Sequence, residues 1–459
     1  MKEKKVAVFG VGRVGLPLAL VLADKGFVVT GVDVDPYRIS LLKHKLMPFL
    51  EEGAQPLLEK HSGKNFQIFS QQHLGRIITE SQIIIITLGT PIDDTYSPNF
   101  SGIEELIATM SPFIHEGQLI IFRSTISPGT TEQLIRQLEG QTKLRLGDTL
   151  FVAYCPERIA EGKSIEELSE IPQIIGSQDE ESGKKAATVF EKITPKILFT
   201  DSRSAELAKL FCNMYRYIDF AIGNEFMMIA ESYDCNIYEV LNLVNKDYKR
   251  AGLKSPGLTA GPCLVKDGFF LIDKSPFMEL VTAAWRLNEN IPGYLLSRIK
   301  EKLKDLHKKK VAILGLAFKK NIDDIRYSLS PKLQRYFLAE GCKVATHDPY
   351  IDSQTLNETL KGADILIMGM NHDAFKELNL STLKELVSPE CLICDIWNLF
   401  NTGKIIFNIN EQIDLNKKTS PKSDSSNGEI KLPITDTKEV KNVKKRSQLD
   451  DRRKIQITN

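Results

Sequence analysis

Short apolar runs alternate with helix-like stretches throughout the first 200 residues. Five of these runs are continuous enough to be strands that are buried on both faces. The predicted strands cover residues 6–10, 27–33, 83–87, 119–125 and 150–157. Buried strands separated by helices are typical of a parallel sheet covered on both sides, so we predict a doubly wound α/β domain.

A different periodicity begins near Asp201. Apolar residues recur at helical spacing at positions 207, 210, 211, 214, 218, 221, 222, 228 and 229, and no proline interrupts them. Asp201 or Ser202 is suited to cap the start of this helix. We predict one long helix that joins two domains and offers a dimer surface, followed by a second helical segment near residues 278–306.

The strand pattern returns at residues 311–315, 343–349, 364–369 and 391–397. The first of these runs, VAILG, is similar to VAVFG near the N-terminus, but LAFKK follows it instead of a glycine fingerprint. We therefore predict two Rossmann-like doubly wound parallel-sheet domains joined by a long central helix and a helical middle domain. The expected boundaries are residues 1–200, 201–305, 306–412 and a disordered basic tail at 413–459.

Composition narrows the possible partners and compartment. The tail has no aromatic residue and too few apolar ones to offset ordering, and a net charge of only +1 for the whole chain gives no case for nucleic-acid binding. No secretory signal and no membrane span are expected, which predicts a cytoplasmic protein with reduced thiols. Cys391 and Cys394 lie in an apolar run without a second ligand pair, so we expect core cysteines and no metal site.

A glycine fingerprint follows the first predicted strand. Gly10, Gly12 and Gly15 permit a tight turn and let backbone N–H groups approach a diphosphate. Asp33 ends the next strand, 18 residues after Gly15, where a carboxylate accepts the ribose hydroxyls of NAD and repels the 2′-phosphate of NADP. Arg38 is either a contact to the cofactor's phosphate or adenine or a surface arginine. NAD is the predicted cofactor.

Other residues have the chemistry of a catalytic site. Cys263 lies between Gly-Pro and a Lys266-Asp267 pair, which is suited to a nucleophilic thiolate, although a structural cysteine would have the same surroundings. Lys209 and Asn213 project from one face of the long helix and could stabilise an oxyanion or hold a water, or form an ordinary exposed pair. Their neighbours Leu210 and Phe211 are expected to face the core.

Two more motifs lie at the carboxyl ends of predicted strands, where doubly wound folds bind ligands. Ser124-Thr125 ends the fourth predicted strand, and Cys155-Pro-Glu157 ends the fifth, with Glu161 shortly after it. Each motif alone is also compatible with a helix cap or a turn.

Together and in this order, these motifs resemble the UDP-glucose/GDP-mannose dehydrogenase family. The resemblance runs from about residue 4 to about residue 400 and includes Thr90-Pro91 and the segment AFKKNIDDIRYS at 317–328, which is similar to the loop of the family's third domain. It implies an NAD-dependent oxidation of the C6 alcohol of a UDP-hexose to a carboxylate, using two NAD in sequence. By the same resemblance, Cys263 adds to the intermediate aldehyde as a thiohemiacetal, which is oxidised to a thioester and hydrolysed by water.

The resemblance also implies roles for individual residues. Lys209 and Asn213 stabilise the oxygen that becomes anionic, and Asp267 positions the lysine or a water. Thr125 and Glu157 hold the water chain, with Glu157 as the candidate base for hydrolysis. The implied cofactor contacts are Gly10, Gly12, Gly15, Asp33, Arg38, Thr90, Thr125, Glu161, Lys266 and Arg326. The implied substrate contacts are Glu157, Lys209, Asn213, Lys254, Gly257, Phe318 and Lys319. A homodimer through the central helix is expected.

The choice of sugar rests on smaller differences. Cys155-Pro-Glu-Arg158 and Thr90-Pro-Ile-Asp93 are similar to the branch that acts on UDP-N-acetylhexosamines, whereas Glu161-Gly162 follows the glucose branch. An arginine that the family often places after the last strand is missing from DIWNLF at 395–400. By a small margin we favour UDP-ManNAc or UDP-GlcNAc over UDP-glucose. The alternatives are a two-electron dehydrogenase of the hydroxyacid type and a catalytically inactive NAD-binding regulator.

Overall fold

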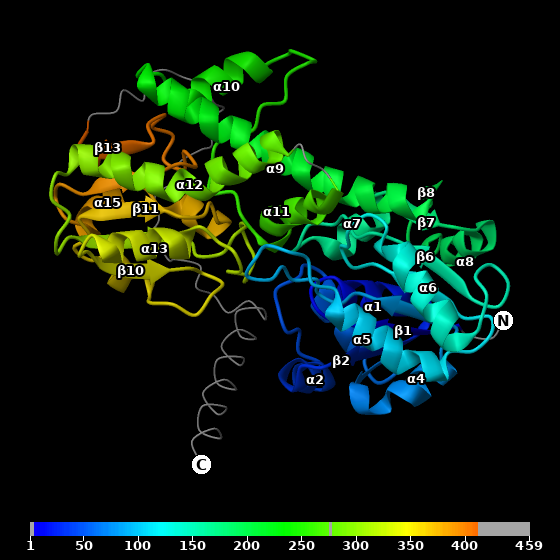
Figure 1. Cartoon of the computed structure of the whole chain (residues 1–459). Coiled ribbons are helices and arrows are strands. Elements are labelled where there is room, and N and C mark those ends of the chain that lie inside the picture. The colour runs from blue at the N-terminus through cyan, green and yellow to red at the C-terminus, as the bar shows by residue number, and fades with distance from the viewer. Residues whose placement is uncertain (1–3, 275–277, 412–459) are drawn as a thin grey trace. The chain divides into compact units, whose positions relative to one another are not determined.

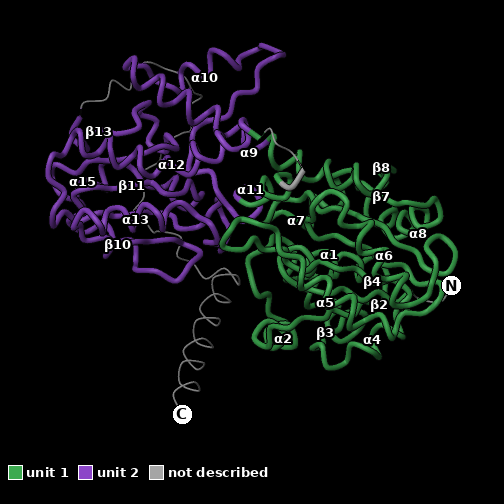
Figure 2. Tube along the Cα trace, in the orientation of Figure 1, with its two compact units in different colours: residues 1–215, 266–278 green, residues 216–265, 279–459 purple. Residues whose placement is uncertain are grey.

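The computed structural model describes residues 4–274 and 278–411. The chain divides into two compact units, which Figure 2 shows in green and purple. The first unit comprises Met1–Tyr215 and Lys266–Met278, and the second comprises Arg216–Val265 and Glu279–Asn459. The tail at 413–459, which we expect to be disordered, lies outside the described residues.

The first unit is built on a sheet whose strand order in the described chain is β3-β2-β1-β4-β5-β6-β7-β8. Its strands are β1 (Lys5–Phe9), β2 (Val28–Asp33), β3 (Phe66–Ser70), β4 (Ile83–Ile86), β5 (Leu119–Phe122), β6 (Phe151–Tyr154), β7 (Gln173–Ser177) and β8 (Ile197–Thr200). Neighbouring strands are parallel except for the β6–β7 pair, which is antiparallel. All five strands predicted in this region are confirmed, and β3, β7 and β8 are additional to them.

Helices cover both faces of this sheet (Figure 1). Val6 and Val8 of β1 point to one face and Ala7 and Phe9 to the other, so the strand is apolar on both faces after its first residue, Lys5. The helices against the first face are α1 (Gly15–Asp24), α2 (Pro36–Lys43), α3 (Ala54–His61), α7 (Ser164–Glu170) and α8 (Glu180–Phe190). Those against the second are α4 (Leu74–Glu80), α5 (Ser101–Met110) and α6 (Thr130–Thr142). The strand order reverses between β1 and β4, which is where doubly wound sheets bind ligands.

The predicted long helix is confirmed as α9 (Ser202–Ser232), and the chain passes from the first unit to the second within it. The second predicted helical segment is confirmed as α12 (Glu279–Lys302). Between them lie α10 (Ile237–Asn245), α11 (Pro262–Lys266) and the 3₁₀ turn η3 (Asp267–Lys274). The expectation that Phe211 of α9 faces the core is wrong, because its side chain is 57% exposed, whereas Leu210 is fully buried.

The second unit contains a smaller sheet with the order β10-β9-β11-β12-β13. Its strands are β9 (Lys310–Leu314), β10 (Lys343–His347), β11 (Ile365–Met368), β12 (Leu392–Cys394) and β13 (Ile406–Asn408), and only β13 is antiparallel to its neighbour. Helices α9, α10, α12 and α13 (Ser330–Ala339) pack on one face, and α14 (Leu356–Leu360) and α15 (Leu380–Leu386) pack on the other. The four strands predicted here are confirmed, and the order reverses between β9 and β11.

Candidate active site

The glycine fingerprint forms the turn between β1 and α1. Gly10 has a positive φ of 88°, and a Cβ on Gly15 would lie 2.0 Å from the carbonyl oxygen of Gly10, so neither position accepts a larger residue. Over Gly12, by contrast, no described atom lies within 4 Å of the place where a Cβ would be. Two glycines therefore close the turn and the third leaves the backbone open, which fits the approach of a dinucleotide diphosphate.

Asp33 ends β2 beside this turn. Its buried carboxylate accepts hydrogen bonds from the backbone N–H of Val11 at 2.9 Å and from Nη1 of Arg38 at 2.8 Å. The side chain of Arg38 is half-buried and also lies 2.9 Å from the second carboxylate oxygen. The carboxylate is thus fixed next to the glycine turn, where the ribose of a dinucleotide binds, and Arg38 is held against it.

A buried polar cluster joins α9 to the start of η3. Nδ2 of Asn213 donates to Oδ2 of Asp267 at 2.6 Å, and Nζ of Lys209 lies 3.8 Å from the same oxygen. Asp267 is fully buried, and Lys209 and Asn213 are 6% and 8% exposed. An ordinary exposed pair at Lys209 and Asn213 is therefore excluded.

Lys266 extends this cluster towards the carboxyl ends of β4 and β5. Its Nζ lies 3.5 Å from Oδ1 of Asp267 and donates to the carbonyl oxygen of Thr90 at 2.9 Å. The hydroxyl of Thr90 in turn donates to the carbonyl oxygen of Thr125 at 2.7 Å. The buried carboxylate of Asp267 thus has a lysine on either side, and Lys266 links it to Thr90 and, through Thr90, to Thr125.

Glu157 follows β6 and is held by Arg123, a residue that the sequence analysis did not identify. The guanidinium of Arg123 donates to Oε2 of Glu157, and the backbone N–H groups of Arg158 and Ile159 donate to Oε1 at 2.7 and 2.9 Å. Arg123 is 2% exposed and Glu157 is 8% exposed, so this is a buried ion pair. The signal in the sequence was an arginine directly before Ser124 at the end of an otherwise apolar strand.

An ion pair joins Glu161 to the glycine turn. Its partner is Arg13, a second arginine that the sequence analysis did not identify. Oε2 of Glu161 is 3.7 Å from Nε of Arg13, and Arg13 is a variable position of the fingerprint itself. The guanidinium of Arg13 also lies 4.9 Å from the centroid of the Phe49 ring. The loop after β6 is therefore connected to the fingerprint by a cation that lies within it.

Cys263 belongs to α11, and its side chain is exposed. Two glycines of the preceding loop are covered by aromatic rings of the second unit. A Cβ on Gly257 would lie 2.3 Å from the ring of Trp397, and a Cβ on Gly261 would lie 2.6 Å from the ring of Phe318. Gly261 also has a positive φ of 113°. The loop needs glycine at both positions because the rings pack directly on its backbone.

A chain of buried amides fixes the same loop to α9 and α12. The backbone N–H of Gly257 donates to Oδ1 of Asn224 at 2.9 Å, and Nδ2 of Asn224 donates to Oδ1 of Asn288 at 2.9 Å. Nδ2 of Asn288 donates to the carbonyl oxygen of Tyr217 at 3.1 Å. Both asparagines are fully buried. The sequence analysis did not identify these two asparagines. Each could have been found as a polar residue on the apolar side of its helix, where helical periodicity predicts an apolar one.

The remaining predicted residues lie on loops of the second unit. Lys254 is exposed, with its Nζ 3.8 Å from a carboxylate oxygen of Asp219. Phe318 and Lys319 follow β9 and are half-buried. Arg326 is exposed and folds back onto Asp324, whose carboxylate accepts from its Nη2 at 2.6 Å. Lys254 and Arg326 therefore present cations at the surface of this unit.

Three segments of the chain match domains of a single enzyme family. The NAD binding domain of the UDP-glucose/GDP-mannose dehydrogenase family matches residues 4–194, its central domain matches residues 203–291, and its UDP binding domain matches residues 312–402. The chain belongs to this family. The resemblance that the motifs carry is confirmed, and with it the doubly wound fold class.

Individual relatives have related substrates. The chain is 32% identical to the UDP-N-acetyl-D-mannosamine dehydrogenase of Methanocaldococcus jannaschii over 413 residues, which cover 87% of this chain and 93% of the relative. Among solved structures it is similar to the UDP-D-ManNAc dehydrogenase of Pyrococcus horikoshii, with a TM-score of 0.79, 31% identity and coverage of 83% and 93%. A UDP-glucose dehydrogenase of Pyrobaculum islandicum gives a TM-score of 0.75, 25% identity and coverage of 82% and 92%.

The protein is therefore an NAD-dependent oxidoreductase that acts on a CH–OH group of a nucleotide sugar. The open backbone at Gly12 and the carboxylate of Asp33 fit NAD, the cofactor of the matched N-terminal domain. Across residues 4–274 and 278–411, no helix is long and apolar enough to cross a membrane. The same residues contain no group of three His, Cys, Asp or Glu side chains placed to hold a metal ion.

Proposed function

We propose that the enzyme oxidises the C6 alcohol of a UDP-hexose to the carboxylate in two successive two-electron steps, with Cys263 as the covalent catalyst. The observation that carries this proposal is the buried cluster of Lys209, Asn213 and Asp267. Such a cluster is suited to an oxygen atom that gains negative charge. The exposed thiol of Cys263 supports it, because this thiol precedes Lys266 and Asp267 by one turn of α11.

Bound NAD supplies the hydride acceptor for each oxidation. The ammonium of Lys209 and the amide of Asn213 stabilise the C6 oxygen, and Asp267 orients the amide through its hydrogen bond. The first oxidation removes a hydride from C6 and the proton of its hydroxyl, which gives the aldehyde. The thiol of Cys263 then adds across the C6 carbonyl, so that a carbon–sulfur bond forms and the oxygen takes the proton of the thiol. Loss of a hydride and of that proton gives the thioester. Water then breaks the carbon–sulfur bond, releasing the carboxylate and restoring the thiol.

The hydrolytic water is assigned to Thr125 and Glu157. Both residues follow strands of the first unit at their carboxyl ends, and Arg123 holds one carboxylate oxygen of Glu157 in place. A fixed carboxylate is suited to orient water and to accept its proton. We propose that Glu157 is this base and that Arg123 sets its orientation.

For the substrate we propose a UDP-N-acetylhexosamine, with UDP-ManNAc and UDP-GlcNAc ahead of UDP-glucose. The sequence CPER at 155–158 and the names of the relatives from Methanocaldococcus jannaschii and Pyrococcus horikoshii support this order. Lys254, Gly257, Phe318 and Lys319 are the proposed contacts of the UDP-sugar in the second unit. Arg326 is assigned to the cofactor, together with Arg38, Thr90, Glu161 and Lys266 in the first unit.

We further propose a homodimer that forms through α9, in the cytoplasm. Large apolar side chains on this helix are exposed, namely Phe211, Tyr215, Phe226 and Ile229, and so is Tyr233 directly after its end. Exposed large apolar side chains that recur along one helix are typical of an interaction site, and a two-fold dimer buries the same face of both copies. Residues 1–200, 201–305 and 306–412 are the proposed cofactor, dimerisation and UDP-sugar domains.

A panel of UDP-ManNAc, UDP-GlcNAc, UDP-galactose and UDP-glucose tests the reaction. We expect two NADH per sugar oxidised, and we expect Cys263→Ser to lose steady-state turnover by at least about 10²-fold because the covalent step is lost. Cys235→Ser removes an exposed thiol elsewhere and should be as active as the wild type. One NADH per sugar with an active Cys263→Ser variant would show a two-electron dehydrogenase. No NADH from any sugar would favour an NAD-binding regulator.

A further inference from the structure

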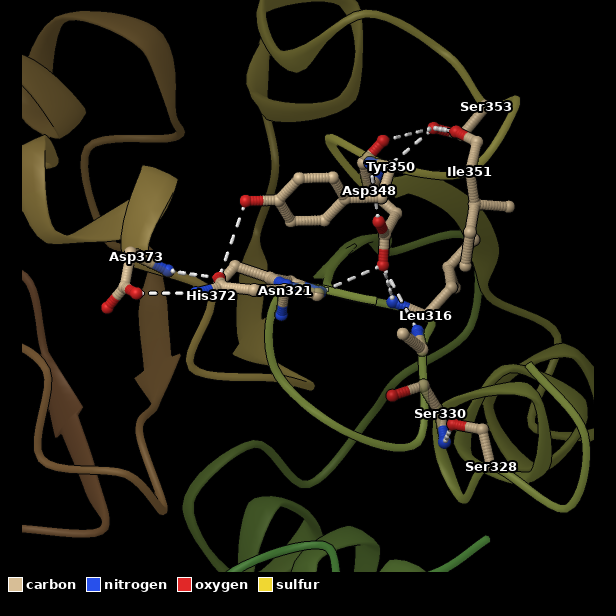
Figure 3. A network of polar contacts seen from close by, with 11 residues as sticks. Leu316, Asn321, Ser328, Ser330, Asp348, Tyr350, Ile351, Ser353, His372 and Asp373 are labelled. Carbon is tan, nitrogen blue, oxygen red and sulfur yellow. Dashed lines mark hydrogen bonds and ion pairs between the residues drawn. The ribbon is translucent and has the colours of Figure 1, made fainter. Parts of the chain in front are cut away.

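A buried aspartate and histidine meet at the carboxyl ends of β9, β10 and β11, where the strand order of the second sheet reverses (Figure 3). Asp348 follows β10 and His372 follows β11. Nε2 of His372 lies 3.1 Å from Oδ2 of Asp348, and both side chains are 0% exposed. Neither residue carries a role in the reaction proposed above.

The contacts of this pair define which nitrogen of a neutral His372 ring carries the proton. The backbone N–H of Asn321 donates to Nδ1 of His372 at 2.9 Å, so this nitrogen must carry a lone pair. The proton of a neutral ring then resides on Nε2 and is donated to Asp348. Burial alone would raise the pKa of Asp348. The hydrogen bond from His372, the charge of that ring when it is protonated, and the hydrogen bonds from the N–H groups of Tyr350 and Leu316 outweigh burial, so the pKa of Asp348 lies below its ordinary value.

Both ends of one loop segment rest on this pair. The backbone N–H groups of Leu316 and Ala317 donate to Oδ2 of Asp348 at 2.6 and 3.1 Å, and that of Asn321 donates to His372. Asn321 has a positive φ of 59°, a conformation that costs free energy unless the surroundings hold it. The side-chain oxygen of Asn321 also accepts a hydrogen bond from the backbone N–H of Asp373 at 3.0 Å, which is a second contact that fixes this residue. The enclosed residues are Phe318, Lys319 and Lys320.

The first unit shows what the same position does without a histidine. Asp33 also follows the second strand of its sheet and accepts a backbone N–H from the residue after the first glycine, Val11. Asp33 also accepts from the backbone N–H of Asp35 at 2.9 Å, as Asp348 accepts from that of Tyr350. The two carboxylates differ in their side-chain partner, which is the 31% exposed Arg38 for Asp33 and the fully buried ring of His372 for Asp348. The carboxylate of the second unit therefore anchors a loop and is not placed to bind a ribose.

We propose that His372 is a positioning residue for UDP-sugar binding: with Asp348 it fixes the segment 316–321 so that Phe318 and Lys319 are preorganised for the nucleotide sugar. This inference rests on the proposed contacts of Phe318 and Lys319. The ring of Phe318 also packs on Gly261, two residues before Cys263, so the same segment supports the loop that carries the thiol. Preorganisation of a binding loop lowers the entropic cost of binding and acts mainly on affinity.

Replacement of His372 separates its two contacts. His372→Leu removes both, His372→Asn keeps an acceptor close to the N–H of Asn321, and His372→Gln keeps a partner for Asp348. We expect His372→Leu to raise the Kd of UDP in calorimetry and the KM of the UDP-sugar by about tenfold, as for the loss of a buried hydrogen bond, with a smaller change in kcat. His372→Asn should restore most of the UDP affinity, His372→Gln should restore less, and the affinity for NAD should stay constant in all three.

His61 provides a matched control in the first unit. It is also buried, with Nε2 2.9 Å from Asp24 and Nδ1 2.8 Å from the side chain of Asn65. His61→Leu should lower the melting temperature and leave UDP affinity unchanged. The inference is overturned if His372→Leu binds UDP like the wild type, or if His61→Leu weakens UDP binding to the same degree. A wild-type protein that neither binds UDP nor oxidises a UDP-sugar refutes the proposed function itself. Should His372→Leu not fold, the comparison of His372→Asn with His372→Gln decides.

Discussion

At the scale of single residues, the cysteines differ in burial. Burial raises the pKa of Cys155 and of Cys391 to about 12, while Cys263 and Cys235 are exposed. Cys391 and Cys394 belong to separate hydrophobic clusters on the two faces of the second sheet. The expectation that these two are core cysteines is confirmed.

We therefore predict two classes of thiol towards Ellman's reagent at pH 8. Cys263 and Cys235 should react within the first phase, because only an accessible thiolate attacks the reagent. Cys155, Cys391 and Cys394 should react only in denaturant, where all 7 cysteines become available. Cys263→Ser should lose one equivalent from the fast phase, and Cys391→Ser should lose none. A reduced fast phase in Cys391→Ser would contradict the burial of that thiol.

Asp33 gives a second prediction at this scale. Its carboxylate holds the guanidinium of Arg38 and places a negative charge where the 2′-phosphate of NADP would lie. Asp33→Asn removes that charge and frees Arg38 for a phosphate. We expect the ratio of kcat/KM for NADP to kcat/KM for NAD to rise by about 10 to 100-fold, as for one or two charge-assisted contacts. The double variant Asp33→Asn, Arg38→Ala should lose the gain, and an equal gain without Arg38 would contradict this role.

At the scale of elements, the end of β10 carries a group that makes stability depend on pH. Burial lowers the pKa of His347, opposed by its hydrogen bond to the carbonyl oxygen of Gln354 at 2.8 Å and by the charge of Asp348. The nearby ring of His372 also lowers it. The unfolded chain binds a proton at the ordinary pKa of histidine, about 6.5, whereas the folded chain binds one only at lower pH.

The sign of the effect follows from this difference. Stability from the neutral ring of His347 is fully present above the ordinary pKa and is lost as the pH falls through the lowered, folded-state pKa. His347→Gln keeps a donor for Gln354 and does not titrate. We expect the free energy of unfolding of the wild type, measured in urea between pH 8 and pH 5, to fall relative to that of His347→Gln. Parallel pH profiles of the two proteins would contradict the prediction.

Strands also differ in how easily they could be predicted from the pattern of apolar residues in the sequence. The strands β1, β4 and β5 are buried on both faces, so their unbroken apolar runs were visible in the sequence. β3 alternates buried and exposed residues, and β8 leaves Leu198 and Phe199 more than half exposed, because both are outermost strands of the sheet. An edge strand lacks the continuous burial that makes a strand easy to recognise.

At the scale of the whole molecule, exposed apolar surface points to a partner. Tyr233 at the end of α9 is 76% exposed and Leu243 of α10 is 71% exposed. Both lie in the second unit, which also exposes Ile229 of α9 and Tyr248, three residues after the end of α10. Surface of this kind is costly in water unless it is covered.

We predict that charge at this surface dissociates the proposed homodimer. Tyr233→Glu combined with Leu243→Glu should convert the dimer seen in sedimentation velocity into a monomer. In a two-fold interface each substitution places one buried, unpaired charge in each of the two copies. Leu198→Glu, which adds the same charge to an exposed apolar position on β8, is the matched control and should leave the dimer intact. A wild-type monomer at micromolar concentration would contradict the proposal.

The sequence by itself determined most of the helices and strands and the glycine turn with Asp33, because these depend on residues close to one another along the chain. It also determined the family, through a series of short motifs that are each local. Periodicity reports whether a face of a helix is apolar, but it does not report what covers that face, so Phe211 was expected in the core. Only the tertiary structure decided that Arg123 pairs with Glu157, that Asn224 and Asn288 hold Gly257, and that Asp348 pairs with His372. These contacts join residues 24 to 64 positions apart, and their distances are set by the packing of strands and helices against one another, which no local pattern encodes.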